Sequence, residues 1–527
     1  MGGDLRFGWF VSAGRVLGCE DRWAVWFGVT GLLAGCVCFV FVKGAMKSFD
    51  RELVSGNLTR SVWKLMWPVV LTQLAAGVHG FIDQVMVGHY IDGIEANAGI
   101  GAAWQVFLVF IVFLSSLFHG MAILTARYAG KRDHESVNKV AYDVFITAVY
   151  LLVFVVGPLG YWISPYLLDL VNTAPEVKAH ALPYIRFLFM ASVPMFMMFL
   201  LNGAFLSTGN PKIPVVLNVL TAVTHVLLSW LFITGAGPFP EMGSLGAAVG
   251  TCAGPIPSVL LALYLILRHK VILGPPKRFS CVPDWGVIKS VTRLGVPAGT
   301  QAVLLNIGGV ALYAFIGGLP NSAEAQAAYT ICYGQLFSFV TWTGFGVRAA
   351  SATLIGQNIG AGKTERGIRA VYLSALFGFV WASSFGVLYW FFPDTLLGFF
   401  NVKDGETLII GTSLLHYLTF SGIFVIVSLA LTGGLQGAGD TVSPMLIAFA
   451  TQIVILLGIC EVYRQSGNLT TDVIWAAILV SHVCRFGLSL VVFRRGRWKG
   501  LRVSIDEPDE PELDPYVEAA PDSEGSG

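Results

Sequence analysis

Ionisable side chains inside long apolar stretches of this chain are the first candidates for chemistry, because a charge there is costly. Asp83 lies near the end of the stretch 62–87, and His225 and Arg348 lie within later stretches of the same kind. An ionised group at membrane depth is costly, so such residues normally face a cavity and take part in ion or proton movement. Asp83 is the strongest candidate. The alternative is that it lies close enough to the membrane surface to be solvated.

Each of these groups offers a different chemistry. Desolvation would favour the protonated carboxyl of Asp83 and make it a proton carrier, whereas a nearby Lys or Arg would hold it ionised. His225 is either a titratable neighbour of Asp83 in a proton site or a hydrogen-bonded structural residue. Arg348 could counter a buried carboxylate, accept an anionic ligand or extend toward the membrane surface. Three further histidines are interpreted as satisfied core residues without a role: His79, His119 and His416.

The composition shows what kind of elements must hold these groups. Of the 527 residues, 55% are hydrophobic and only 12% charged, about half the charged fraction of a soluble domain. Apolar runs of about 20 residues, long enough to cross roughly 30 Å of hydrocarbon, recur along the whole sequence. The chain is therefore expected in a lipid bilayer, which excludes a nucleic-acid binder, a secreted domain and a cytosolic enzyme. The eight cysteines show no C-x-x-C motif or clustered histidines, so no disulfide framework, metal or other cofactor is expected.

Runs bounded by charges or by Gly and Pro turns predict an all-α membrane protein with twelve transmembrane helices. The predicted spans are 62–87, 103–126, 141–163, 182–206, 214–235, 245–267, 291–317, 328–355, 370–392, 407–432, 444–463 and 472–493. Lys and Arg gather before the first span and after the second, fourth, sixth, eighth and last. The positive-inside rule therefore places both ends of this body in the cytoplasm, which agrees with an even number of spans.

Both termini extend beyond the twelve-helix body. Residues 1–59 contain a further apolar run, 23–42, which is an extra helix, a signal peptide or a result of translation assigned too far upstream. A start at Met46 is favoured, because the residues that follow it supply a basic lead into the first span. Residues 498–527 contain nine acidic residues and four prolines with little apolar content, so an acidic disordered tail is expected.

The chain also matches itself, which indicates an internal duplication. The matching landmarks are separated by 229 or 230 residues: Pro68 and Pro297, Gly130 and Gly360, and Gly209 and Gly439. With an even number of helices per half, the halves have the same orientation and face each other across a central cavity, which suits alternating access. The predicted domains are an N-lobe at 60–267, a basic cytoplasmic linker at 268–290 and a C-lobe at 291–497, with six helices in each lobe.

Four short motifs carry a resemblance to one known family. They are Phe81 to Gly88, Asn202-Gly203 with Gly209-Asn210 and Pro214, Gly356 to Gly362, and Gly434 to Thr441 with Pro444. Together they resemble multidrug and toxic compound extrusion (MATE) transporters, in order, over most of the chain. The resemblance implies a V-shaped bundle of two six-helix lobes that is not an enzyme. It implies a monomer in the plasma membrane, the bacterial inner membrane, that exports small amphipathic, often cationic molecules in exchange for H+ or Na+.

The resemblance also implies roles for residues of the first lobe. Asp83 takes the place of the family's first-lobe acid, and the hydroxyl of Thr251 matches one in its first-lobe cation site. His225 stands where an Asn is usual and Ser229 where an Asp is usual, so one carboxylate remains where two are expected. Because Na+ prefers several oxygen ligands, H+ is the expected coupling ion and Na+ the alternative.

The second lobe departs from the family pattern more strongly. Leu305 and Val425 stand where relatives carry a Glu and an Asp, so no acidic coupling site is expected there. The polar residues expected to line the substrate cavity are Asn202, Asn306 and Arg348.

Two rival functions come from other readings of the same sequence. Tyr142-Asp143 and Gly437 to Asp440 reproduce the Y-D and G-x-G-D pairs of intramembrane aspartyl proteases. However, both acids fall at predicted helix ends, and Gly439-Asp440 has a counterpart in Gly209-Asn210, which favours a structural turn. The nearer rival is a flippase for lipid-linked precursors from the same superfamily. Such flippases usually have extra helices and several cavity arginines.

Overall fold

The computed structural model describes residues 51–73, 94–170, 175–276, 279–400, 402, 405–501 and 503, and within these ranges the chain is helical without a strand. After α3 (Arg51–Ser55), the helices of the first half are α5 (Ile94–Lys131), α6 (His134–Tyr150), α7 (Gly157–Leu170), α8 (Pro175–Ala191), α9 (Val193–Ser207), α10 (Lys212–Thr234), α11 (Ser244–Ala253) and α12 (Ile256–Leu267). Those of the second half are α13 (Trp285–Gly317), α14 (Ser322–Tyr329), α15 (Ser338–Gly360), α16 (Thr364–Phe391), α17 (Pro393–Gly398), α18 (Glu406–Ala438), α19 (Val442–Ala448), α20 (Gly458–Gln465) and α21 (Thr471–Arg495). We call α5 to α12 the N-lobe and α13 to α21 the C-lobe.

Every predicted span after the first falls on helix in the structure. Several spans are composite, because π-helical turns join neighbouring α-helices: η1 (Leu151–Val156), η2 (Thr330–Leu336) and η3 (Phe449–Leu457). In the part of the chain that the structure describes, nine helices are long and apolar enough to cross a membrane, or up to ten if α8 and α9, bent by 53°, form one span. The first predicted span is helical over residues 58–73, and its remainder, with Asp83, lies outside the described residues. The run 23–42 and Met46 also lie outside them.

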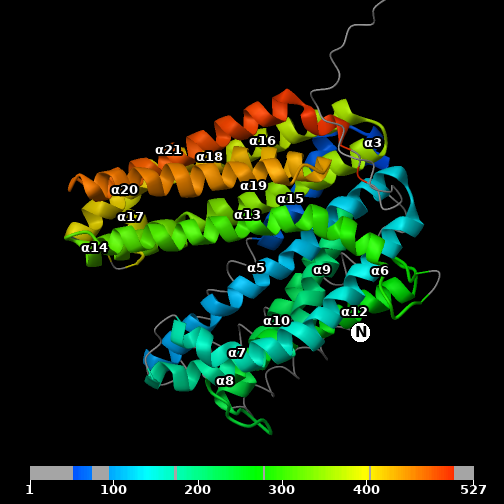
Figure 1. Cartoon of the computed structure of the whole chain (residues 1–527), viewed down its shortest axis with the longest axis horizontal. Helices are drawn as coiled ribbons and strands as arrows, with labels where there is room; N and C mark the ends of the chain where they lie inside the picture. Colours follow the sequence, from blue (N-terminus) through cyan, green and yellow to red (C-terminus); the bar gives the residue numbers. More distant parts are fainter. Residues whose placement is uncertain are drawn as a thin grey trace, which may run out of the picture.

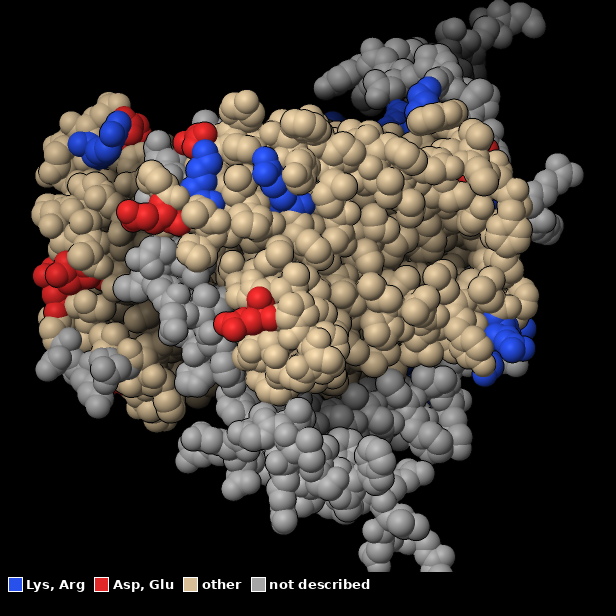
Figure 2. Space-filling model, turned by 90° about the horizontal axis from the view of Figure 1, so that it is seen from below, with Lys and Arg blue, Asp and Glu red and all other residues tan. Residues whose placement is uncertain are grey.

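The surface agrees with a membrane environment. Figure 2 shows a broad uncharged surface between Lys, Arg, Asp and Glu side chains that lie mainly toward the two ends of the molecule. Large apolar side chains are exposed in both lobes, among them Phe154 and Trp162 of the N-lobe and Phe391 of the C-lobe. Because a soluble protein rarely exposes so much contiguous apolar surface, lipid is the environment that fits it.

The two lobes form a V (Figure 1). They converge where α3, α6 and the end of α15 lie, which we call the closed end, and they diverge toward α7 and α8 on one side and α14, α17 and α20 on the other, which we call the open end. At the closed end α5 and α15 run in contact, and a Cβ added at Gly130 or Gly360 would overlap the backbone of Gln357 or Arg127 on the facing helix. Only glycine allows so close an approach.

Hydrogen bonds between the lobes support this closed end. The Gln357 side-chain amide donates to the backbone carbonyl of Ser207 over 2.7 Å, and a guanidinium nitrogen of Arg127 donates to the carbonyl of Ala438 over 3.2 Å. Gln357 and Arg127 are the residues whose backbone faces the two glycines, and each bond joins one lobe to the other. The conformation described is therefore closed at this end by both packing and polar contacts.

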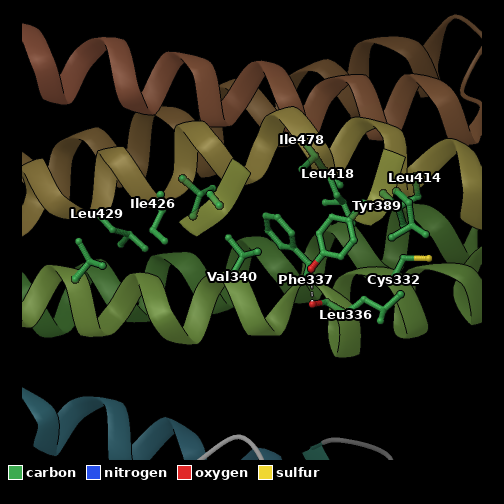
Figure 3. Close-up of a cluster of buried hydrophobic side chains, with 14 of the residues drawn as sticks. Cys332, Leu336, Phe337, Val340, Tyr389, Leu414, Leu418, Ile426, Leu429 and Ile478 are labelled. Atoms are coloured by element: carbon green, nitrogen blue, oxygen red, sulfur yellow. Dashed lines mark hydrogen bonds between the residues drawn. The ribbon is translucent and has the colours of Figure 1, made fainter. Parts of the chain in front are cut away.

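The apolar cores cross the boundary between the lobes. The largest cluster belongs mainly to the C-lobe (Figure 3), where the Tyr389 hydroxyl donates to the carbonyl of Leu336 over 2.8 Å. Residues from the start of the chain are part of this cluster: Leu53, Val62, Leu65 and Met66. Conversely, Val287, Ile288 and Val291 of α13 belong to an N-lobe cluster. The first helix of each half thus begins in the core of the opposite lobe, and the predicted domain limits at 267 and 291 stay a prediction.

The segment between the lobes is attached to α6. The Asn138 side chain accepts from the backbone N–H of Gly274 over 2.9 Å, and the Tyr150 hydroxyl donates to the carbonyl of Cys281 over 2.6 Å. Lys139 forms a 2.7 Å ion pair with Asp284, which caps the N-terminus of α13 by accepting from Gly286 N–H. The hydrogen bond from Lys139 holds the pKa of Asp284 below its ordinary value. The linker therefore fixes the start of α13 against the N-lobe.

Candidate functional site

Three of the predicted site residues meet inside the N-lobe. His225 and Ser229 lie one turn apart on α10, and Thr251 lies on the adjacent α11. The Nε2 atom of His225 is 3.3 Å from the Thr251 hydroxyl and 3.4 Å from the Ser229 hydroxyl. His225 and Ser229 are almost completely buried, with 1% and 0% of their surface exposed. The sequence separates Thr251 from the other two, so their contact depends on how α10 packs on α11.

Two glycines, Gly250 of α11 and Gly254 directly after it, make that contact possible. A Cβ added at Gly250 would overlap the Ser229 hydroxyl, and one added at Gly254 would lie 2.7 Å from the Cα and Cβ atoms of His225. The backbone of α11 therefore lies directly against the two polar side chains of α10. The Thr251 hydroxyl donates to its own helix at the Ala247 carbonyl over 3.0 Å, so its oxygen accepts from His225 Nε2. The site offers a ring nitrogen and two hydroxyls, without a carboxylate at position 229.

The residues predicted for the substrate cavity are not brought into this cluster. Asn202 of α9 is half-buried, and its amide nitrogen lies 3.5 Å from the side-chain oxygen of Asn218 on α10. Asn306 of α13 is exposed, and its amide donates to the Ala302 carbonyl of its own helix over 2.9 Å. Arg348 of α15 is half-buried, and its guanidinium lies 3.3 Å from Nε2 of His119 on α5. The candidate substrate residues are thus spread over both lobes.

Comparison with models of known protein families shows which family this chain matches. The family described as MatE matches residues 68–231 and again 297–460, which together make up more than half of the chain. The chain belongs to the MatE family. The two matched segments of this MatE protein are separated by 229 residues, the offset at which Pro297 follows Pro68.

Curated relatives of this MatE protein match it over nearly their whole length. A protein of Thermotoga maritima named "Probable multidrug resistance protein NorM" is 25% identical over 456 residues, which cover 84% of this chain and 94% of the relative. One of Bacillus subtilis named "Probable multidrug resistance protein YoeA" is 24% identical, covering 85% and 98%. The prediction of a MATE-type multidrug efflux transporter family is therefore confirmed.

Solved structures agree on the fold. One reported as "Outward-facing conformation of a multidrug resistance MATE family transporter of the MOP superfamily" matches with a TM-score of 0.77 and 18% identity, over 85% of this chain and 98% of that chain. One reported as a MOP superfamily transporter from Pyrococcus furiosus with reverse polarity of the binding pocket matches with the same values. The predicted all-α membrane fold with two six-helix lobes is confirmed.

The MatE structure also shows polar groups that the sequence interpretation missed. Arg485 of α21 is half-buried in the C-lobe, where its guanidinium donates to the Thr451 hydroxyl over 3.2 Å and to the Gln452 amide oxygen over 2.7 Å. Among the described residues no carboxylate lies within 4.0 Å of Arg485. Its position inside the apolar run 472–493 is the same signal that selected Arg348, so the sequence could have revealed it.

The motif behind the protease alternative has a structural role in this MatE protein. Asp440 accepts hydrogen bonds from the backbone N–H of Ser443 over 2.9 Å and from the Ser443 hydroxyl over 2.6 Å, which is the arrangement of a helix cap. Gly439 and its repeat counterpart Gly209 both have a positive φ, 103° and 87°. These residues therefore form the same turn twice, as the repeat predicts.

Proposed function

We propose that this protein exports small amphipathic molecules, cationic drugs or metabolites, from the cytoplasm in exchange for protons. Membership of the MatE family supports transport across a membrane, and the names of the relatives support multidrug efflux. The closed end carries Arg127, Lys131 and Arg132, so the positive-inside rule favours placing it in the cytoplasm of the bacterial inner membrane. In this orientation the described conformation is closed to the cytoplasm. The protein acts as a monomer in this proposal.

The buried group around His225 is the observation that carries the choice of proton. A Na+ ion takes several oxygen ligands, whereas here an imidazole nitrogen lies between two hydroxyls, 3.3 and 3.4 Å away. An imidazole can instead take up and release a proton near neutral pH. In the proposed cycle Asp83 is protonated from outside, which shifts the lobe toward a conformation that releases substrate, and the resetting step delivers the proton inward. Thr251 and Ser229 hold the ring of His225.

Substrate contacts are proposed for Asn202, Asn306 and Arg348. Asn306 is exposed on α13, while the other two are half-buried on helices of opposite lobes. The amides can accept from a cationic amine or donate to a carbonyl, and the arginine selects against cations placed close to it. Substrate bound between the lobes would therefore keep its charge away from Arg348.

Transport by purified protein in liposomes tests the proposal. Proton and sodium gradients are imposed separately, and the movement of a panel of cationic dyes is followed by fluorescence. An acid gradient alone is expected to drive dye transport without sodium. Transport that requires sodium and ignores pH would overturn the proposed coupling, and it would overturn the interpretation of His225 and Ser229.

A flippase for anionic lipid-linked precursors is the second candidate. Arg485 and Arg348 favour it, because both are half-buried in the C-lobe and, within the described ranges, neither has a carboxylate within 4.0 Å. Adding a fluorescent lipid pyrophosphate to the same panel distinguishes the two. Transport of that lipid without transport of any dye would replace the first proposal by the second.

A further inference from the structure

His119 and Arg348 face each other across the boundary between the lobes. His119 lies on α5 of the N-lobe and Arg348 on α15 of the C-lobe, and the guanidinium Nη2 is 3.3 Å from the imidazole Nε2. His119 directly follows Phe118, the repeat equivalent of Arg348 at the offset of 230 residues that relates Gly130 to Gly360. The packing of α5 against α15 therefore brings a histidine and an arginine together at the interface between the lobes.

The contacts of the imidazole define its protonation state in this conformation. Nδ1 is 2.7 Å from the carbonyl oxygen of Ser115, which can only accept, so Nδ1 carries a proton. The guanidinium of Arg348 can only donate, so Nε2 must be the acceptor and carry none. His119 is thus neutral here. A second proton on the ring would place two donors and two positive charges 3.3 Å apart.

The backbone around the pair leaves it little room to adjust. A Cβ added at Gly433 of α18 would overlap the Arg348 carbonyl, and one added at Gly295 of α13 would overlap the carbonyl of Ser116 beside His119. Helix α15 is therefore held from behind by α18, and α5 by α13. Because packed interfaces shift between discrete arrangements rather than deform continuously, separating the two side chains requires movement of whole helices.

Few other charges face the ring within the part of the chain that the structure describes. Helix α9 and residues 65–73 have no titratable side chain, and α15 has only Arg348. On α13 the nearest charged residues, Lys289 and Arg293, are exposed near its start, and α18 has no titratable residue on the stretch that packs against α15 near Gly433. On α5 itself the next charged residue is Arg127. Among the described residues, the guanidinium of Arg348 is therefore the charged group in contact with the His119 ring.

We propose that His119 is a proton-binding site of the transport cycle, separate from the group around His225. Neutral His119 accepts from Arg348 and stabilises the contact of α5 with α15, whereas protonated His119 repels Arg348 and releases it. The ligand of this site is a proton, and its binding controls how the two lobes pack against each other. This role rests on the proposed proton coupling, and it adds a site through which a proton would act directly on the interface between the lobes.

Spin-label distances measure the lobe movement without relying on transport. Labels at Tyr166→Cys of α7 and Phe399→Cys after α17, which are 74% and 80% exposed, report on the open end in a background without native cysteines. The wild-type distance distribution is expected to change as the pH is lowered, because a protonated imidazole repels Arg348. His119→Gln keeps an acceptor for Arg348 but cannot titrate, so it is expected to hold the high-pH distribution at all pH values. His119→Lys is expected to give the low-pH distribution throughout.

Two further variants keep the test decisive if His119→Gln folds poorly. In Arg348→Gln the facing amide tolerates either state of the ring, so the pH-dependent change is expected to shrink or disappear. His416→Gln is the matched control, because His416 lies against Trp390 within the C-lobe, and it should keep the wild-type response. A wild-type distribution that ignores pH, or a His119→Gln or Arg348→Gln variant that responds as wild type does, overturns the proposal.

Dye transport by the same variants separates this inference from the proposed function. An acid gradient should drive transport by wild type and His416→Gln, and the rate should fall by tenfold or more in His119→Gln. If wild type shows pH-dependent distances but no proton-driven transport, the proposed function fails, and the proton-dependent contact between the lobes stands without a role in transport. If transport is proton-driven and His119→Gln keeps the wild-type rate and distances, the proton site fails alone.

Discussion

The close contact between α5 and α15 makes a strong prediction about a single methyl group. In Gly130→Ala the new Cβ would lie 2.7 Å from the carbonyl carbon and 2.8 Å from the Cα of Gln357 on the facing helix. Since carbon atoms normally approach to about 3.5 Å, the helices must separate by at least about 0.8 Å. Neither partner atom belongs to a side chain that could rotate away, so we expect the closed end to loosen.

The expected magnitude follows from the cost of overpacking. Forcing one extra carbon into a packed interface costs about 1–3 kcal/mol. If the conformation with separated helices escapes this cost, the equilibrium between the two conformations shifts toward it by roughly 5- to 150-fold. The substitution acts in the opposite direction on the isolated helix, because Ala is favoured over Gly in a helix by up to about 1 kcal/mol. A loss of closure would therefore report the contact between lobes and not a weakened α5.

Spin labels at the closed end provide the assay. Glu135→Cys at the start of α6 and Arg369→Cys near the start of α16 are exposed positions in opposite lobes. Gly130→Ala should lengthen the distance between them or add a longer population. Gly309→Ala is the matched control, because a Cβ at Gly309 of α13 meets nothing within 4 Å. Equal distances in wild type, Gly130→Ala and Gly309→Ala would refute the reasoning.

Three further predictions concern charged and polar groups elsewhere. Asp83→Asn should abolish proton-driven dye transport while the protein still inserts and folds, because loss of a charge favours insertion; wild-type transport rates would remove Asp83 from the mechanism. His225→Asn combined with Ser229→Asp should raise sodium affinity, measured as sodium-dependent thermal stabilisation, and an unchanged melting temperature in sodium would speak against a cation site there. Asp284→Asn keeps the cap of α13 but loses the ion pair with Lys139, which is worth at most about 1 kcal/mol because the side chains are 44% and 46% exposed. Since the pKa of Asp284 is lowered, the pair stabilises the protein at pH values above the ordinary carboxyl pKa and stops doing so as the pH falls through the folded value. Melting curves of wild type and Asp284→Asn should therefore differ at pH 7 and converge as the pH falls below the folded pKa.

Hydropathy and loop charge predict the positions of the membrane spans well, because a membrane span needs an apolar run of fixed length. They do not predict the π-helical turns at η1, η2 and η3, which interrupt spans that read as uniform apolar runs. They also cannot show that Val62 and Leu65 pack in the C-lobe cluster, since an apolar residue fits either core equally well. That choice depends on how the lobes meet.

Part of the candidate site could also be predicted from hydropathy, because polar residues are conspicuous in apolar runs. His225, Ser229 and Thr251 stand out as polar residues in apolar helices, and the structure places the two hydroxyls 3.3 and 3.4 Å from Nε2 of His225. Their role in ion coupling stays a prediction. The contact between His119 and Arg348 could not be predicted that way, because it joins two helices of different repeats. His119 taken alone resembles any buried histidine, and only the structure shows that it faces an arginine.

The exchange of apolar residues between the lobes has a consequence for biosynthesis. Helix α13 leaves the ribosome after every N-lobe helix, yet Val287, Ile288 and Val291 complete an N-lobe cluster. The residues around Val62 and Leu65 emerge first, but their packing partners belong to the half that is synthesised last. Neither half can therefore bury its apolar side chains alone during insertion, and a chain interrupted between α12 and α13 would give two fragments that must find each other in the membrane.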